Sequence, residues 1–296
     1  MSKMYAIETN HLTKYYGKSR GIEELNLTVN KGEFFGFIGP NGAGKSTTIR
    51  TLLGLIKSNS GSASVLGLDI QKDKEAILER IGYLPSETTF YAGMRGRDVL
   101  KLSADLRKRD CREEAEMLCE RLQLDSSKKV EELSFGNKKK LAIICALQHR
   151  PELLILDEPT GGLDPLMQRE FFQILQERNA EGTTIFLSSH ILAEVQRNCS
   201  RAGIIRDGKL IACDSVEALS RTNAKRVHVQ GDVSVEELKE VRDLRSTEHG
   251  MTFLYGGDIQ SLLRVFAKQP IQDLSISEPD LEEIFMHYYA DGGEIQ

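Results

Sequence analysis

The sequence of 296 residues lacks the patterns that mark several large classes of protein. Its five cysteines are odd in number, widely spread and without a Cys-x-x-Cys pair, which argues against a disulfide framework or a zinc site. The six histidines contain no His-Glu-x-x-His pattern, so a zinc protease of that type is excluded. No apolar run approaches the roughly 20 residues of a membrane-spanning helix, and the first residues lack the apolar core of a signal peptide. We therefore expect a cytoplasmic chain with reduced thiols.

An excess of one charge is also missing. The 39 lysines and arginines nearly balance the 44 aspartates and glutamates, which leaves a formal net charge of −5. Such a chain is not suited to coating nucleic acid, so no nucleic-acid partner is expected. Hydrophobic residues make up 40% and charged residues 28%, a balance typical of folded globular proteins. At about 150 residues per domain, the length suggests about two domains.

A glycine-rich loop between a predicted strand and a predicted helix is the first positive signal. The apolar run 33–39 predicts a buried strand, and helical spacing follows from Thr48 to Ile56. Backbone N–H groups of such a loop can wrap a phosphate, Lys45 can reach the β- and γ-phosphates, and the Ser46 hydroxyl can ligate Mg²⁺. The predicted phosphate-binding residues are Gly39, Pro40, Asn41, Gly42, Ala43, Gly44, Lys45, Ser46 and Thr47.

A second apolar strand, residues 153–157, ends in two carboxylates. Asp157 at its end is expected to bind Mg²⁺ directly or through another ligand, and Glu158 is expected to polarise an attacking water molecule. Taken alone, the two acids could equally be solvated residues at the end of a buried strand. The phosphate-binding loop upstream favours the catalytic interpretation.

Two further segments are weak signals by themselves. Ser134 and Gly136 precede a predicted helix, which is typical of a helix N-cap, and the lysines 138–140 alone predict a solvated helix face. His190 follows the predicted strand 184–188, and a lone histidine in such a place is more often structural than catalytic.

The remaining pattern divides the chain into two predicted domains, 1–222 and 223–296. In the first, strands in residues 5–30 and a hairpin turn at 207–208 accompany alternating strands and helices, which predicts an α/β domain with a mainly parallel sheet. Residues 72–150 are predicted to be mostly helical. The second is predicted to be a small α+β domain, with strands near 227, 251–255 and 271–276. Its predicted helices begin at Ser234, at Ile259 and near Pro279.

In their order and spacing, these segments resemble the ATP-binding cassette (ABC) ATPases over about residues 4–220. The loop 39–46 matches the Walker A motif of the family, and residues 153–158 match Walker B with its glutamate. Residues 133–137 occupy the place of the signature Leu-Ser-Gly-Gly-Gln, and residues 159–165 resemble the D-loop region. His190 matches the switch histidine, and Tyr16 matches the aromatic residue that stacks on adenine.

This resemblance implies a P-loop NTPase fold with a mainly parallel sheet, an antiparallel β subdomain and a helical subdomain. It implies an ATPase that uses Mg²⁺ and works as a head-to-tail pair of cassettes, in a homodimer or a heterodimer. ATP on Lys45 and Ser46 of one copy would be capped by the signature of the other. The residues implied for that cap are Ser134, Gly136 and Asn137, and Asp164 would link the two sites. Glu158 would activate water, and His190 would hold the transition-state geometry.

The sequence departs from the family pattern at two places. Ser86 stands where the family usually has a glutamine that touches Mg²⁺, so Ser86 is a candidate metal contact that would act through water. The alternative is that Glu87, the next residue, substitutes for the glutamine. The signature carries Phe135 and Asn137 instead of glycine and glutamine. We expect hydrolysis to be retained but slow or dependent on a partner.

The ending 273–285 resembles that of ATPases from ABC-2-type exporters, which include drug, antibiotic and bacteriocin export systems. This implies a separate transmembrane permease subunit and a peripheral position on the cytoplasmic face of the membrane. The alternatives are a soluble ABC ATPase that acts on ribosomes or DNA and a regulatory module that does not hydrolyse ATP. A GTPase is disfavoured because no Asn-Lys-x-Asp motif is present. The sequence does not indicate the cargo.

Overall fold

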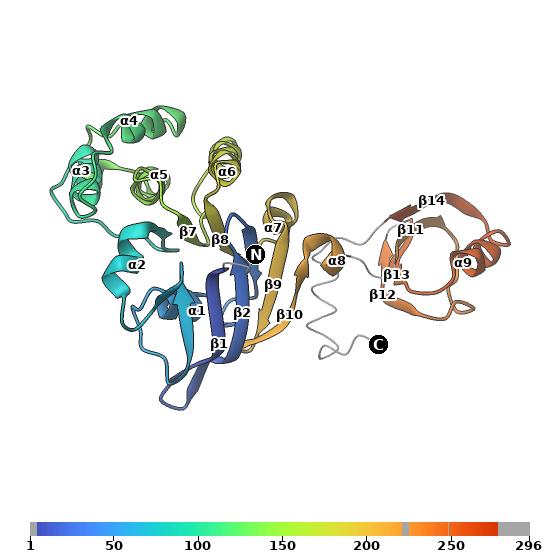
Figure 1. Cartoon of the computed structure of the whole chain (residues 1–296). Helices are drawn as coiled ribbons and strands as arrows, with labels where there is room; N and C mark the ends of the chain where they lie inside the picture. Colours follow the sequence, from blue (N-terminus) through green and yellow to red (C-terminus); the bar gives the residue numbers. More distant parts are fainter. Residues whose placement is uncertain (1–4, 221–224, 248, 278–296) are drawn as a thin grey trace. The chain divides into compact units, whose positions relative to one another are not determined.

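The computed structural model describes residues 5–220, 225–247 and 249–277 (Figure 1). The chain divides into two compact units, Met1–Val216 and Glu217–Gln296. This division falls at the start of helix α8 (Val216–Ser220), whereas the sequence pattern placed a boundary after residue 222. Each unit has its own sheets and its own hydrophobic core.

The first unit is built on a six-stranded sheet in the order β10-β9-β3-β8-β7-β6. Its neighbouring strands are parallel except at the β9–β10 edge, as the sequence predicted. The strands β3, β7 and β8 are buried along their whole length, because both faces of a parallel sheet are covered. The bounds are β3 Phe34–Ile38, β6 Ile81–Leu84, β7 Leu153–Asp157, β8 Thr184–Ser189, β9 Arg201–Arg206 and β10 Lys209–Ser215.

A four-stranded antiparallel sheet, in the order β2-β1-β4-β5, forms the second layer of this unit. The predicted strands in residues 5–30 are confirmed: β1 and β2 form an antiparallel hairpin, and its turn contains Gly17 with a φ of 59°. Apolar side chains of both sheets, among them Leu25 and Phe37, belong to one buried core. The bounds are β1 Tyr5–Tyr16, β2 Ser19–Asn30, β4 Ser60–Val65 and β5 Leu68–Asp69.

Helices complete the first unit, and α3, α4 and α5 lie together as a helical part (Figure 1). Helix α1 ends at Leu52 and not near Ile56, because Gly54 takes a φ of 63° and closes the helix as a left-handed glycine commonly does. Strand β6 lies in a segment predicted to be helical, and α7 was not predicted. The bounds are α1 Lys45–Leu52, α2 Lys74–Arg80, α3 Gly96–Asp105, α4 Arg112–Arg121, α5 Phe135–Leu147, α6 Pro165–Ala180 and α7 Leu192–Asn198.

The second unit contains an antiparallel sheet in the order β12-β13-β11-β14, with helix α9 packed on it. The Phe253 and Phe266 rings meet edge to face, with centroids 6.2 Å apart, in the core between α9 and the sheet. The bounds are β11 Lys225–Gly231, β12 Val241–Thr247, β13 Gly250–Tyr255, α9 Ile259–Phe266 and β14 Ile271–Ser277.

Two expectations for this unit have different outcomes. The helix predicted to begin at Ser234 is wrong, because Val235 and Leu238 turn into the core and the chain then enters β12. The helix predicted near Pro279 lies outside the described residues. Within the described ranges, no helix is both long and apolar enough to cross a membrane.

Candidate active site

The central sheet brings three predicted motifs to one edge. Strands β3, β8 and β7 are parallel neighbours, with Ile38 beside Ser189 and Asp157 beside Ser188. The carboxyl ends of parallel neighbours share an edge, where ligands of open α/β sheets commonly bind. The glycine-rich loop, Glu158 and His190 each follow one of these strands, and the fold therefore places them together.

The conformation of the loop 39–46 requires glycine at two positions, Gly39 and Gly44, because any Cβ atom there would clash with a neighbouring carbonyl oxygen. A Cβ atom at Gly44, where φ is 110°, would lie 2.6 Å from the carbonyl oxygen of Gly21. A Cβ atom at Gly39 would lie 2.6 Å from the carbonyl oxygen of Ile205. The Lys45 ammonium donates to the carbonyl oxygens of Gly39 at 2.5 Å and of Pro40 at 3.2 Å, and α1 begins at Lys45. The loop therefore presents backbone N–H groups and a helix N-terminus, which favour an anion.

Glu158 lies between two of the predicted catalytic side chains. Its Oε1 is 3.3 Å from the Lys45 Nζ, and its Oε2 is 2.6 Å from the His190 Nδ1. The backbone of Glu158 has a φ of 49°, a left-handed conformation that costs a non-glycine residue about 1–3 kcal/mol. Such strain persists where the surroundings enforce it, and here it aims the carboxylate at the phosphate-binding loop.

A pocket of about 260 Å³ lies beside this loop and is lined by Ser46, Thr47, Ser86 and Glu158 among others. Asp157 is buried next to it and accepts a hydrogen bond from the Ser188 hydroxyl at 3.1 Å. Arg20, which no sequence motif indicated, also lines the pocket and pairs with Asp207 at 3.0 Å. The pocket therefore offers hydroxyl and carboxylate oxygens beside an anion-binding loop.

Tyr16 lies at the end of β1, close to the start of α1. A Cβ atom added at Gly21 would be 3.1 Å from the Tyr16 ring and 2.9 Å from the Thr47 methyl group, so the ring and the loop are separated only by this glycine. Nearly half of the Tyr16 side chain is exposed, and the Lys14 ammonium lies 5.3 Å from its ring centroid. The exposed ring can stack on a flat partner next to the phosphate-binding loop.

The signature residues are not brought to this pocket within the chain. Ser134 caps α5 by accepting from the Asn137 N–H at 3.3 Å, as the N-cap pattern predicted. Gly136 lies against Gly162, whose carbonyl oxygen is 2.7 Å from the place of a Cβ at Gly136. None of Ser134, Gly136 and Asn137 is among the residues that line the pocket.

Asp164 has a local structural role. Its carboxylate caps α6 by accepting from the N–H groups of Leu166 and Met167, each at 3.0 Å. Phe135, which is 66% exposed, packs its ring against the backbone of Gly162 in the same D-loop region. The structure therefore joins the signature to the D-loop.

Lys139 is a residue that the sequence reasoning missed. The solvated face predicted for the lysines 138–140 is wrong for Lys139 and Lys140, which are both buried. The Lys139 ammonium donates to the carbonyl oxygens of Pro85, Ser86 and Glu158, each at 3.2 Å. Burial lowers the pKa of Lys139 to about 8, against the opposing attraction of the nearby carboxylates. The helical spacing of the sequence does indicate this burial, because position 139 shares a helix face with the core residue Ile143, one turn further on.

Glu194, in the first turn of α7, was also missed. Its buried carboxylate accepts hydrogen bonds from the hydroxyls of Thr160 at 2.7 Å and Ser189 at 2.8 Å. Burial raises the pKa of Glu194. The residue therefore ties the segment that carries His190 to the segment that leads into Asp164.

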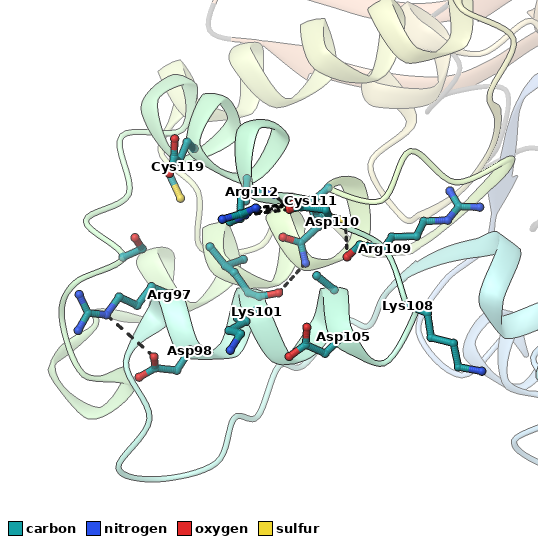
Figure 2. A pocket seen from close by; sticks show the side chains of 16 residues that line it. Arg97, Asp98, Lys101, Asp105, Lys108, Arg109, Asp110, Cys111, Arg112 and Cys119 are labelled. Carbon is teal, nitrogen blue, oxygen red and sulfur yellow. Dashed lines mark hydrogen bonds and ion pairs between the residues drawn. The ribbon is translucent and has the colours of Figure 1, made fainter.

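A separate pocket of about 920 Å³ lies in the helical part, between α3 and α4 (Figure 2). Its lining includes the apolar residues Leu100, Ala104 and Ala115 together with basic and acidic side chains. The charged residues that line it are Arg97, Asp98, Lys101, Asp105, Lys108, Arg109, Asp110, Arg112 and Glu116. This pocket contains none of the predicted site residues.

Comparison with known proteins identifies the family. The family described as ABC transporter matches residues 22–161, and that described as AAA domain, putative AbiEii toxin, Type IV TA system, matches residues 128–195. The bacitracin transport ATP-binding protein BcrA of Bacillus licheniformis is 38% identical to this chain, over 97% of the chain and 98% of the relative. The chain belongs to the ATP-binding proteins of ABC transporters. It is therefore an ATP-binding subunit with ATPase activity, and its interpretation as a ribosome- or DNA-acting ATPase is disfavoured.

Solved structures agree with this assignment. An ATP-binding subunit of an ABC transporter aligns with a TM-score of 0.70 at 30% identity, over 73% of this chain and 92% of its own. The dimeric bacterial ABC transporter cassette MJ0796 aligns with a TM-score of 0.65 at 24% identity, over 71% of this chain and 98% of its own, and shows that the fold is shared. The predicted P-loop NTPase fold is therefore confirmed.

Proposed function

We propose that this ABC ATPase drives the export of an antibiotic or a similar compound through a separate transmembrane permease subunit, at the cytoplasmic face of the membrane. The observation that carries the catalytic part is the position of Glu158 between Lys45 and His190. The export part is supported by full-length similarity to a bacitracin transport ATP-binding protein.

In this proposal ATP lies along the loop 39–47, with its adenine against the Tyr16 ring. Lys45 can exchange its contact with Glu158 for phosphate oxygens, because its ammonium already lies at the mouth of the loop. The oxygen atoms of Ser46, Asp157 and Ser86 fit Mg²⁺, which prefers oxygen ligands and commonly shares them with substrate phosphates. The bound ion would neutralise charge on the phosphates.

Glu158 is the proposed general base. The His190 Nδ1–H donates to its Oε2 at 2.6 Å and fixes one oxygen of the carboxylate. The other oxygen, Oε1, is buried 3.3 Å from the Lys45 ammonium, and it can accept a proton from the attacking water once Lys45 turns to the phosphates. Lys45 would stabilise the charge that develops on the γ-phosphate.

A second copy of the cassette is proposed to complete each site. Ser134, Gly136 and Asn137 lie at the N-terminus of α5, outside the pocket, where the helix dipole favours an anion supplied by another molecule. The dimeric cassette that shares this fold supports the arrangement. Gly162 contacts Gly136 of the signature, and Asp164 follows it two residues later. We therefore propose Asp164 as the link between the two ATP sites.

The pocket between α3 and α4 is our candidate surface for the permease subunit. A pocket lined by apolar residues and by charges of both signs suits an amphipathic segment of a protein, and Leu106 at the end of α3 adds an exposed apolar contact. The double variant R97E/K101E should lose co-purification with the permease while its own ATP hydrolysis stays unchanged. Co-purification at the wild-type level would exclude this surface.

The test of the catalytic proposal is Glu158→Gln. The change removes the base but keeps the shape, so we expect hydrolysis with Mg-ATP to fall by about 10²–10⁴-fold while ATP binding persists. Glu79→Gln, an exposed glutamate of the same unit, is the matched control and should keep the wild-type rate. Wild-type hydrolysis by Glu158→Gln would overturn the proposal. For the export part, the permease should co-purify from membranes with the full chain and stimulate Glu158-dependent hydrolysis.

A further inference from the structure

Lys139 is 1% exposed, which is unusual for a lysine. A buried ammonium is costly unless its hydrogen-bonding groups are satisfied. An ammonium has three donors, and Lys139 directs it to three backbone carbonyl oxygens, those of Pro85, Ser86 and Glu158, each at 3.2 Å. The acceptors come from two segments that are far apart in the sequence, residues 85–86 and residue 158. Lys139 therefore does more than fill space in the core.

The three carbonyl groups belong to two different elements of the candidate active site. Pro85 and Ser86 follow β6, Glu158 follows β7, and Lys139 itself lies on α5, just over one turn beyond Ser134. One side chain therefore connects the helix that begins at the signature with the Ser86 loop and with the proposed base. The contacts use only backbone oxygens, so they do not depend on the short side chain at position 86.

Of the three residues that accept from Lys139, Glu158 depends most on the contact for its backbone conformation. Its left-handed backbone, with a φ of 49°, is held from both sides: its N–H donates to the Ser188 carbonyl at 3.0 Å, and its carbonyl accepts from Lys139. Without the second contact the peptide can rotate toward an ordinary conformation. That rotation would move the carboxylate away from Lys45 and His190.

We propose that Lys139 is a positioning residue of the ATPase site, whose ammonium fixes the backbone of Glu158 and the Ser86 loop to helix α5. A shift of the signature end of α5 then reaches the proposed base through a single side chain. This inference rests on the proposed function, in which Glu158 activates water.

The first test compares Lys139→Met with Lys138→Met in the full chain. Methionine keeps the length and the apolar stem of lysine but has no donor. For Lys139→Met we expect kcat to fall by about tenfold or more and KM for ATP to change by less than about twofold, because the phosphate-binding loop is untouched. Lys138→Met, the same change at the preceding position, which is only partly buried, should keep both constants. Lys139→Gln, which keeps an N–H donor, should recover part of kcat.

The second test is hydrogen exchange, which needs no permease and no turnover. Lys139→Met should exchange faster in the segments around 85–88 and 157–160, while the loop 39–47 keeps its protection. Faster exchange throughout the first unit would show a general stabilising role and overturn the proposal, as would an unchanged kcat. If Lys139→Met does not fold, Lys139→Leu, which also has no donor, carries both tests with the same criteria. Loss of hydrolysis in Glu158→Gln with wild-type kcat in Lys139→Met would refute this inference alone, whereas hydrolysis by Glu158→Gln would refute the proposed function.

Discussion

The two units differ in where their strands end. In the first unit β3, β8 and β7 run parallel, so the loops after them meet at one edge and bring Lys45, Glu158 and His190 together. In the second unit the strands are antiparallel, so the loops that leave neighbouring strands alternate between opposite edges. Strand direction therefore decides that polar residues from distant parts of the sequence converge in one unit and are dispersed in the other.

The largest expected effect tests whether the two units are energetically separate. Phe186 stacks on Phe35 and contacts the tilted ring of Phe37 in the first core, and Phe253 meets Phe266 in the second. Truncation of a fully buried phenylalanine costs about 3–5 kcal/mol. Phe253→Ala should lower only the transition of the second unit in calorimetry, and Phe186→Ala should lower that of the first together with ATP hydrolysis. A loss of hydrolysis in folded Phe253→Ala would show that the two units are not energetically separate.

The next prediction concerns charge in the two units. Lys45→Ala removes an ammonium that faces the proposed γ-phosphate position, so hydrolysis should fall by about 10²–10³-fold. Lys268→Ala, at an exposed position just after α9, is the control in the second unit and should leave phosphate release unchanged. Equal losses in the two variants would show that turnover depends on both units.

The third prediction is a pH dependence that belongs to the first unit. Burial, followed by the charge of Arg107, lowers the pKa of His149 to about 4 from an ordinary value of 6.5. Between these values the unfolded chain binds a proton that the folded chain does not, so the free energy of unfolding decreases as the pH falls through this window. The decrease amounts to about 3 kcal/mol at most.

Urea unfolding between pH 7.5 and pH 4.5 measures this decrease. His149→Gln should flatten the pH dependence, because glutamine does not titrate and can still donate to the carbonyl oxygen of Ile81. His228→Gln, at an exposed position on β11, should leave the slope unchanged. An unaltered slope in His149→Gln would contradict the assignment.

The smallest effect is a helix cap in the second unit. Asp258 caps α9 by accepting from the Ser261 N–H at 3.0 Å. Asp258→Ala should destabilise this unit by about 1 kcal/mol, the usual value of an N-cap, and Asp258→Asn should recover most of it. Neither change should alter ATP hydrolysis. A destabilisation of the first unit instead would show that the two units unfold together.

The same contrast explains which parts of the fold the sequence predicts. The buried strands β3, β7 and β8 are continuous apolar runs, and all were predicted. Strand β12 is exposed along most of its length, so it carries no apolar pattern, and β6 is a short apolar run that periodicity alone does not separate from a helix. The false helix at Ser234 arose because a capping pattern is local, whereas burial of Val235 and Leu238 depends on the whole unit.

The candidate site shows a similar limit. Lys45 and Glu158 were predicted from the loop and the strand that carry them, and His190 from the resemblance to the ABC ATPases. The structure places Glu158 in contact with both of the others. Lys139 and Glu194 were missed because their roles depend on partners far away in the sequence, the carbonyl oxygens of residues 85–86 and 158 and the hydroxyl of Thr160. A motif identifies the groups that act on a ligand, but it contains no information about the groups that hold those residues in place.

The turn between β9 and β10 has a practical consequence for protein engineering. The N–H of Gly208 donates to the carbonyl oxygen of Ala43 in the phosphate-binding loop at 2.9 Å, and its own carbonyl accepts from Glu23 at 2.8 Å. Hairpin tips are usually chosen for inserted tags, reporter proteins or new chain termini, because few contacts are lost there. This tip instead braces the phosphate-binding loop, so an insertion after Asp207 would disturb a segment that lies more than 160 residues earlier in the chain.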